Sequence, residues 1–285
     1  MLTDYHVHLR RDDDPAPGEQ RFTEANVERY TAAAAEQGIV ELGVSEHIHR
    51  FRQALEVWAH PFWREHAHDD LDAYCEFVRE RTSLRLGIEA DFIPGREDRT
   101  ANLLDAREWD YVIGSVHFLR DDAIDMEGDH DIWRSSDPEQ VWRRYFETLG
   151  EAARSGLFDV LAHPDLVKVW GAERPLPEGD LRRFYELAID GIAESDVAIE
   201  VSTGGLRKPV GEIYPARGLL ELCLEAGKPV ALSSDAHTPE QLGHRYDEAV
   251  ELLRSLGVDE ICVFDRRERK LVELGGPTGP SSTAT

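Results

Sequence analysis

The stretch LTDYHVH, residues 2–8, is short and alternates polar with apolar residues from Asp4 onward. Alternation with a period of two is typical of a β-strand that is buried on one face. Side chains two residues apart lie on the same side of a strand, so His6 and His8 point in the same direction. The stretch therefore predicts a strand over residues 2–7 that delivers two imidazoles to one place.

Further short apolar runs predict strands at residues 40–44, 84–88, 111–116, 160–162, 197–201, 230–232 and 261–264. Helical patterns lie between the runs, with Thr23 as a suitable N-cap for the first of them, and cover residues 23–37, 137–155, 181–193 and 239–256. Strands that alternate with helices indicate parallel strands joined by crossover helices. We expect an α/β fold, either an open doubly wound sheet or a barrel of seven or eight strands.

Three segments interrupt this alternation. Residues 51–70 are a polar and aromatic insertion after the second strand, and residues 120–136 are an acid-rich insertion after the fourth. Such insertions are typical of lids and pocket walls. Residues 275–285, GGPTGPSSTAT, are of low complexity, and we expect them to be disordered. With no internal repeat or linker, residues 1–274 are predicted to form a single domain.

The charge balance excludes two classes of partner. The chain has 57 acidic and 32 basic residues, a formal net charge of −25, and the acidic residues are spread along it. Nucleic acid and anionic lipid are bound through clustered Lys and Arg, so we expect neither nucleic acid nor a membrane as a partner. The oligomeric state cannot be inferred from these features.

The cysteines and the N-terminus indicate a compartment. Three cysteines lie far apart without a C-x-x-C pair, which argues against a disulfide framework and against a thiolate zinc site. The first residues, MLTDYHVH, lack a cationic segment followed by an apolar core, and no window approaches the roughly 20 apolar residues of a membrane span. We expect a soluble protein of the reducing cytoplasm.

Histidine and carboxylate side chains follow most of the predicted strands at the point where each strand ends. The carboxyl ends of parallel strands meet at one mouth of a barrel or one edge of a sheet, where ligands bind. Neutral imidazoles and carboxylates suit Zn, Mn or Fe(II). The sequence therefore predicts a metal site built from His6, His8, Glu46, His47, Glu89, His117, His163, Asp235 and His237. The other histidines lack this context, and we expect them on the surface or in the lid, with His60 and His244 as the expected exceptions.

These motifs, HxH, a Glu-His pair, a strand-end Glu, "SVH", "AHPD" and "SSDAH", resemble those of the PHP (polymerase and histidinol phosphatase) superfamily. The segments "VIGSVHFL", "DVLAHPDLVK", "IEVSTGGLRKPVGEIYP" and "LSSDAH" are similar to the histidinol-phosphate phosphatase branch. The resemblance spans residues 3 to about 265. It implies a distorted (β/α)7 TIM-like barrel that holds two or three divalent metal ions. It also implies hydrolysis of L-histidinol phosphate to L-histidinol and inorganic phosphate, a step of histidine biosynthesis.

The resemblance assigns the metal ligands residue by residue. It implies that His6, His8, Glu89 and Asp235 hold a first ion, and that Glu89 bridges to a second ion completed by His117 and His163. A third ion would lie at His47 and His237 with Glu46 nearby, unless Glu46 instead orients a water molecule or His47. Glu89, Asp235 and His237 are then the candidate catalytic residues. Three divalent ions with three carboxylates would leave a net charge of about +3, which attracts a phosphate dianion.

Candidate substrate contacts lie in "STGGLRKPVGEIYP", residues 202–215, after the sixth strand, and beyond "SSDAH". Arg207 can clamp phosphate oxygens through its planar guanidinium, and Lys208 adds a second positive charge. Glu212 is a candidate for the cationic group of histidinol. Arg245 is another candidate for phosphate. The alternative is a Gly-rich barrel loop with a surface Arg-Lys pair, and Arg245 in a surface ion pair.

Three other functions remain open. A PHP phosphoesterase could act on another small phosphate monoester or on a nucleotide. An amidohydrolase-like hydrolase also begins with HxH, but it would usually need a lysine on the fourth strand, which here ends in His117. A non-catalytic metal-binding module, as in PHP domains fused to DNA polymerases, would hold ions without turnover.

Overall fold

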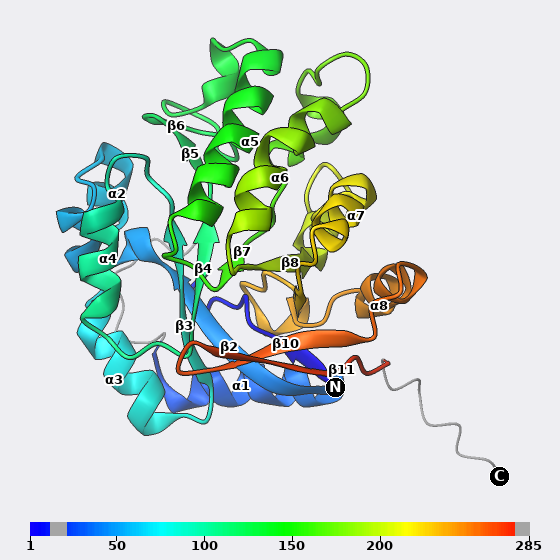
Figure 1. Ribbon diagram of the computed structural model, residues 1–285. Helices are drawn as coiled ribbons and strands as arrows, with labels where there is room; N and C mark the ends of the chain where they lie inside the picture. Colours follow the sequence, from blue (N-terminus) through cyan, green and yellow to red (C-terminus); the bar gives the residue numbers. More distant parts are fainter. Residues whose placement is uncertain (12–21, 277–285) are drawn as a thin grey trace.

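The computed structural model describes residues 1–11 and 22–276. Its central sheet has seven parallel strands, which follow one another around a barrel in chain order (Figure 1): β1 Leu2–Asp4, β2 Ile39–His47, β3 Arg85–Asp91, β4 Tyr111–Ser115, β7 Val160–Leu161, β8 Ala198–Ser202 and β9 Val230–Ser233. Just beyond β1 and β9 the two edges meet, because His8 N–H donates to Ala236 O (2.8 Å) and Ala236 N–H donates to His6 O (3.1 Å). The sheet is thus a nearly closed barrel, and the predicted distorted (β/α)7 fold is confirmed.

Helices surround this barrel (Figure 1): α1 Glu24–Glu36, α2 Pro61–His66, α3 Leu71–Arg81, α4 Glu97–Asp105, α5 Pro138–Arg154, α6 Arg182–Glu194, α7 Arg217–Glu225 and α8 Tyr246–Ser255. Thr23 caps α1 by accepting a hydrogen bond from Asn26 N–H, as predicted. Short 3₁₀ helices complete the connections: η1 Ile48–Arg50, η2 Arg52–Glu56, η3 Ile132–Arg134, η4 Leu166–Lys168, η5 Gly171–Glu173, η6 Thr203–Arg207 and η7 Pro239–Gln241.

The helix predicted over residues 239–256 is wrong at its start. Residues Pro239–Gln241 form only a 3₁₀ turn, and α8 begins at Tyr246. Gly243 and Arg245 between them have φ values of 61° and 52°, in the left-handed region that a right-handed helix cannot contain. The backbone therefore turns before the helix starts.

The run at residues 261–264 is a strand, but it lies outside the barrel sheet. β10 Glu260–Asp265 pairs with β11 Glu268–Glu273 in an antiparallel hairpin. The Phe264 ring packs edge-on against Tyr5, with ring centroids 5.4 Å apart, and Arg267 N–H donates to Asp110 O just before β4 (2.8 Å). The hairpin thus covers the amino end of the barrel, opposite the predicted site.

The barrel interior above this hairpin is filled by an aromatic side chain. Tyr111 is fully buried, and its hydroxyl donates to Tyr5 O (2.6 Å). A Cβ atom at Gly43 or at Gly87 would lie 2.3 Å from the Tyr111 side chain. Glycine on β2 and on β3 is therefore what makes room for this ring of β4.

The two predicted insertions pack against each other. Trp58 and His60, from residues 51–70, stack with ring centroids 4.2 Å apart, and His60 Nε2 lies 3.1 Å from Asp121 O of the second insertion. The small hairpin of β5 Phe118–Leu119 and β6 Asp122–Ala123 leads from His117 into the second insertion. Both insertions start where a barrel strand ends, so they form walls around the carboxyl end.

In the part of the chain that the structure covers, no helix is long and apolar enough to cross a membrane. Of the low-complexity tail, residues 277–285 lie outside the described residues.

Candidate metal centre

The predicted ligand residues gather at the carboxyl end of the barrel. His47 ends β2, Glu46 and Glu89 lie within β2 and β3, and the other residues follow two to four residues after the ends of their strands. The groups of histidine and carboxylate atoms close enough to hold an ion contain His6, His8, His47, Glu89, His117, His163, Asp235 and His237. Eight of the nine candidates that were chosen for their position near strand ends thus lie in these groups, and Glu46 does not.

The first predicted ion has a set of atoms around one point. His6 Nε2 lies 3.3 Å from Glu89 Oε2 and 3.6 Å from Asp235 Oδ1. His8 Nε2 lies 3.6 Å from each of the same two oxygens. Two atoms that bind one tetrahedral ion at about 2.1 Å are about 3.4 Å apart. The spacing is therefore that of ligands around a shared ion, and it is long for direct hydrogen bonds.

Glu89 extends the centre to a second group through its other oxygen. Glu89 Oε1 lies 3.1 Å from His163 Nε2 and 3.3 Å from His117 Nε2, and it accepts a hydrogen bond from the Ser115 hydroxyl. Oε1 thus faces His117 and His163, whereas Oε2 faces His6, His8 and His47, whose Nδ1 lies 2.5 Å away without the geometry of a hydrogen bond. This is the arrangement that a carboxylate shared between two ions needs.

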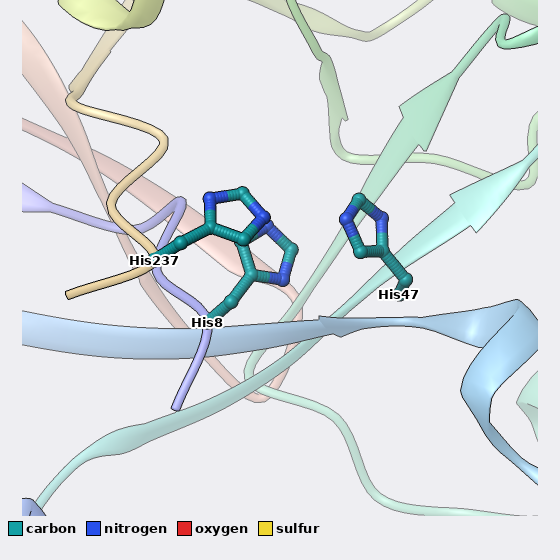
Figure 2. A group of neighbouring side chains, drawn as sticks. All are labelled: His8, His47 and His237. Carbon is teal, nitrogen blue, oxygen red and sulfur yellow. The ribbon is translucent and has the colours of Figure 1, made fainter. Parts of the chain in front are cut away.

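The third group consists of three histidines, shown in Figure 2. The ring of His8 stacks on the rings of His47 and of His237, each with centroids 4.2 Å apart. Ligand atoms of these three residues lie within 4.8 Å of one another. His8 therefore belongs to both the first and the third group.

Glu46 does not join these groups as predicted. Its Oε1 accepts hydrogen bonds from Leu9 N–H (2.6 Å) and Arg10 N–H (3.1 Å), and its Oε2 accepts from Arg50 Nη1 (2.6 Å). Both oxygens are occupied in a fully buried network. Because a carboxylate bonded in this way holds the backbone after His8, we interpret Glu46 as a residue that positions the loop.

Buried atoms without hydrogen bonds test whether these residues fit a metal. His6 Nε2, both ring nitrogens of His8 and Glu89 Oε2 are buried and have no hydrogen-bond partner. A buried polar atom without a partner costs roughly 1–3 kcal/mol, so native proteins rarely leave several together. A cation between His6 Nε2, His8 Nε2 and Glu89 Oε2 would satisfy three of these atoms, and the donor set is one that divalent transition metals prefer. The residues therefore fit a divalent metal centre.

Carboxylates behind the histidines orient two of the rings. His6 Nδ1 lies 2.7 Å from Glu200 Oε1, and His117 Nδ1 lies 2.7 Å from Asp91 Oδ1. Such contacts set the tautomer so that Nε2 faces the ion. Sequence analysis missed both acids. Asp91 could have been found because it lies two residues after Glu89 on the same face of β3, whereas Glu200 lies in a strand that carries no predicted ligand.

The charge state of the histidines follows from their neighbours. Burial opposes a charge on His117, but the carboxylates of Asp91 and Glu89 outweigh it and raise its pKa to about 10. Burial together with the nearby His237 and His47 lowers the pKa of His8 well below its usual value. Because a metal ligand must be neutral, binding of an ion at His117 would release a proton.

Two cavities open beside this centre. One of about 290 Å³ is lined by aromatic and basic side chains, among them Phe62, Phe118, His49 and Arg50. The other, of about 210 Å³, is lined by candidate ligands and by Leu166, Val169 and Trp170. The residues common to both linings are His47, His117, Asp125 and Lys208. A small ligand could therefore contact the cluster and an apolar wall at once.

Comparison with known proteins identifies the family. The PHP domain model matches residues 22–204. The chain belongs to the PHP domain family. The PHP protein is 34% identical over 267 residues to a Deinococcus radiodurans protein named "Probable histidinol-phosphatase", and the match covers 90% of this chain and 94% of the relative. It is 28% identical over 188 residues to the histidinol-phosphatase of Bacillus subtilis, which covers 61% of this chain and 70% of that protein.

A solved structure has the same fold as this PHP protein. It is the histidinol phosphate phosphatase of Lactococcus lactis, complexed with zinc, L-histidinol and phosphate, with a TM-score of 0.68. The likeness covers 94% of this chain and 98% of the other, at 17% identity. It supports the barrel architecture independently of the closer sequence relatives.

Only one of the predicted substrate contacts in the PHP protein lines a cavity beside the centre. Lys208 is exposed at the mouth and borders both cavities. Arg207 is placed differently from the prediction, because its Nη2 donates to Ser234 O (2.8 Å) and Asp235 O (2.7 Å) and so supports the loop of Asp235. Arg245 is exposed and is paired with Glu248, as in the alternative of a surface ion pair.

Glu212 is also placed away from the cavities. Its carboxylate accepts from Lys168 Nζ (3.0 Å), and its side chain is 59% exposed. The same ammonium group donates to Ile213 O (3.0 Å) and pairs with buried Asp165 (3.0 Å). Lys168 therefore ties the "AHPD" segment to the loop over residues 202–215. No sequence signal marked it, because a lysine after a strand is usually at the surface.

Proposed function

We propose that this PHP protein is a metal-dependent phosphatase that hydrolyses L-histidinol phosphate to L-histidinol and inorganic phosphate. The observation that carries the proposal is the Glu89-centred set of unpartnered ligand atoms, in a chain that is similar along 90% of its length to a relative named as a histidinol-phosphatase. The chemistry follows from the site, and the choice of substrate follows from the relatives.

We further propose two or three divalent ions, of zinc, manganese or iron. His6, His8, Glu89 and Asp235 would hold the first, Glu89 with His117 and His163 the second, and His47 with His237 the third. When bound, such ions lower the pKa of water toward neutrality and offset negative charge on phosphate oxygens. Glu89, Asp235 and His237 act in catalysis as the residues that place this positive charge.

The protein's own side chains do the remaining work. Asp91 and Glu200 fix the rings of His117 and His6, so the ligand atoms are already in position when substrate arrives. Lys208 at the mouth adds positive charge beside the phosphate. Water attacks phosphorus in line with the bond that breaks, and the alcohol oxygen leaves with a proton.

The test is phosphate release from L-histidinol phosphate, with a nucleoside monophosphate and an aryl phosphate in parallel, on protein of measured metal content. We expect kcat/KM for histidinol phosphate at least about a hundredfold above the other two, since a polar site rejects substrates that leave its groups unpaired. Comparable rates on all three would keep the phosphatase chemistry and reject this substrate. Bound metal without any turnover would instead indicate a metal-binding module.

A further inference from the structure

Asp125 lies at the junction of the two cavities and has no role in the centre described so far. It follows the β5–β6 hairpin in the second insertion and borders both cavities together with His47, His117 and Lys208. Its Oδ1 is buried and has no hydrogen-bond partner, and among the described residues no basic group lies within ion-pair distance of its carboxylate, although its charge helps to raise the pKa of His117. A carboxylate in this position needs a cationic partner.

The backbone next to Asp125 is held firmly. Ile124 N–H donates to His117 O (2.9 Å), and Ile124 O accepts from Trp133 Nε1 (2.7 Å) and Trp170 Nε1 (2.8 Å). Two indoles and a ligand-bearing loop thus fix the residue before Asp125. Such support is what a side chain needs if it is to recognise a ligand at a set distance from the phosphate.

The other acids near the cavities are already engaged. Among the described residues that line the two cavities, Asp125 and Asp235 are the acidic ones, and Asp235 belongs to the candidate metal centre. Glu212 lines neither cavity and is paired with Lys168. Asp125 therefore remains as the carboxylate that can meet a cation brought by the substrate.

We propose that Asp125 is a specificity residue that accepts hydrogen bonds from a protonated amine on the alcohol part of the substrate. The inference rests on the proposed function, because it assigns the amine of histidinol to this carboxylate. The apolar wall of Leu166, Val169 and Trp170 lies along the same cavity and suits the carbon skeleton. Phosphate at the metal centre and amine at Asp125 then define the substrate class: phosphate monoesters of small cationic alcohols.

The test compares L-histidinol phosphate with its analogue that lacks the amine, using metal-loaded wild-type protein and Asp125→Asn. A hydrogen bond between charged groups contributes roughly 1.5–3 kcal/mol, equivalent to about a 10- to 100-fold preference. We expect wild type to favour the amine-bearing ester by that factor in kcat/KM. In Asp125→Asn the ratio between the two esters should fall close to one, mainly through KM. Asp129→Asn, an exposed acid of the same insertion, is the matched control and should keep the wild-type ratio.

Three results would overturn the inference. If Asp125→Asn lowered kcat/KM equally for both esters, the carboxylate would act on the leaving oxygen or on folding and not on the amine. A loss of bound metal would make it a ligand. A wild-type enzyme without preference for the amine would leave Asp125 without the proposed role.

Failure of the proposed function would look different, since wild type would then turn over neither imidazole ester, or would turn over histidinol phosphate no faster than the nucleoside and aryl phosphates. In that case the affinities of O-phosphoethanolamine, which carries an amine, and of ethyl phosphate, which lacks one, are measured by calorimetry. The difference between them tests the contact of the amine with Asp125 and needs no turnover. Tighter binding of the amine-bearing ester in wild type, lost in Asp125→Asn, would support the inference. Equal binding of both in wild type would reject it.

Discussion

The two ends of the barrel differ in how their polar side chains are paired. At the amino end, arginines are paired with carboxylates, as in Arg79 with Asp110 (2.7 Å) and Arg267 with Asp159 (3.0 Å). At the carboxyl end, histidines gather around Glu89 and buried ligand atoms lack hydrogen bonds. Both ends are built on the same seven strands. The amino end therefore stabilises the fold, whereas the carboxyl end holds groups that need a ligand.

The largest expected effect tests the carboxyl end. Asp235→Ala removes one oxygen of the set shared with His6 and His8, so turnover should fall by at least about a thousandfold and bound metal should decrease. Activity and metal content per chain measure this. The free energy of unfolding of the metal-free protein should change far less. Asp247→Ala, exposed on α8, is the control, and full activity in Asp235→Ala would contradict the assignment of the ligands.

The amino end should respond in the opposite manner. Phe264→Ala leaves a cavity beneath Tyr5 and Tyr111 and should lower the free energy of unfolding by about 3–5 kcal/mol. Urea unfolding measures the loss, and kcat/KM of the folded protein should stay within about twofold of wild type. Val263→Ala, on the other face of β10, should cost less. If Phe264→Ala lowered kcat strongly without lowering the free energy of unfolding, the amino end would take part in catalysis, contrary to this comparison.

A smaller effect on activity is expected from Asp91, which contacts the candidate ligand His117 but not the ion. Asp91→Asn keeps the shape of the side chain but weakens its hold on His117 Nδ1, so metal affinity should fall about 10- to 100-fold. Titration with metal, followed by activity, measures the change, and excess metal should restore most of the turnover. Asp98→Asn, exposed on α4, should behave like wild type. Unchanged affinity in Asp91→Asn would show that the contact with His117 is dispensable.

The smallest effect concerns Arg245, which the sequence suggested as a phosphate contact. Its pair with Glu248 is exposed, and such pairs contribute about 0–1 kcal/mol. Arg245→Gln should therefore leave kcat/KM for the phosphate ester within about twofold. Lys208→Gln at the mouth should lower kcat/KM by more than twofold, mainly through a higher KM. A larger loss of kcat/KM in Arg245→Gln than in Lys208→Gln would mean that Arg245 reaches the substrate.

Much of the fold and of the centre could be predicted from the sequence because both depend on local patterns. His6 and His8 follow two and four residues after the end of β1, and parallel strands bring their carboxyl ends together wherever their loops lead. The roles of Arg207 and Glu212 could not be predicted in the same way. Arg207 turns to the carbonyl oxygens of Ser234 and Asp235, and Glu212 pairs with Lys168, partners that only the tertiary structure brings near.

The outlying parts depended even more on tertiary contacts. The run at residues 261–264 has the composition of a barrel strand, but it pairs with β11 and covers the barrel instead. Asp125 lies in an irregular insertion, and its place at the cavities depends on the β5–β6 hairpin and on two indoles from different segments. Periodicity carries no information about such positions.

The aromatic filling beneath the centre also bears on the order of events in turnover. With Tyr5, Tyr111 and Phe264 packed across the amino end, substrate and both products must use the mouth at the carboxyl end. If phosphate binds at the metal centre as proposed, it lies deeper than the alcohol and leaves after it. Inorganic phosphate should accordingly act as a competitive inhibitor, whereas the released alcohol should inhibit noncompetitively, and initial-rate measurements with each product added would show the sequence of departure.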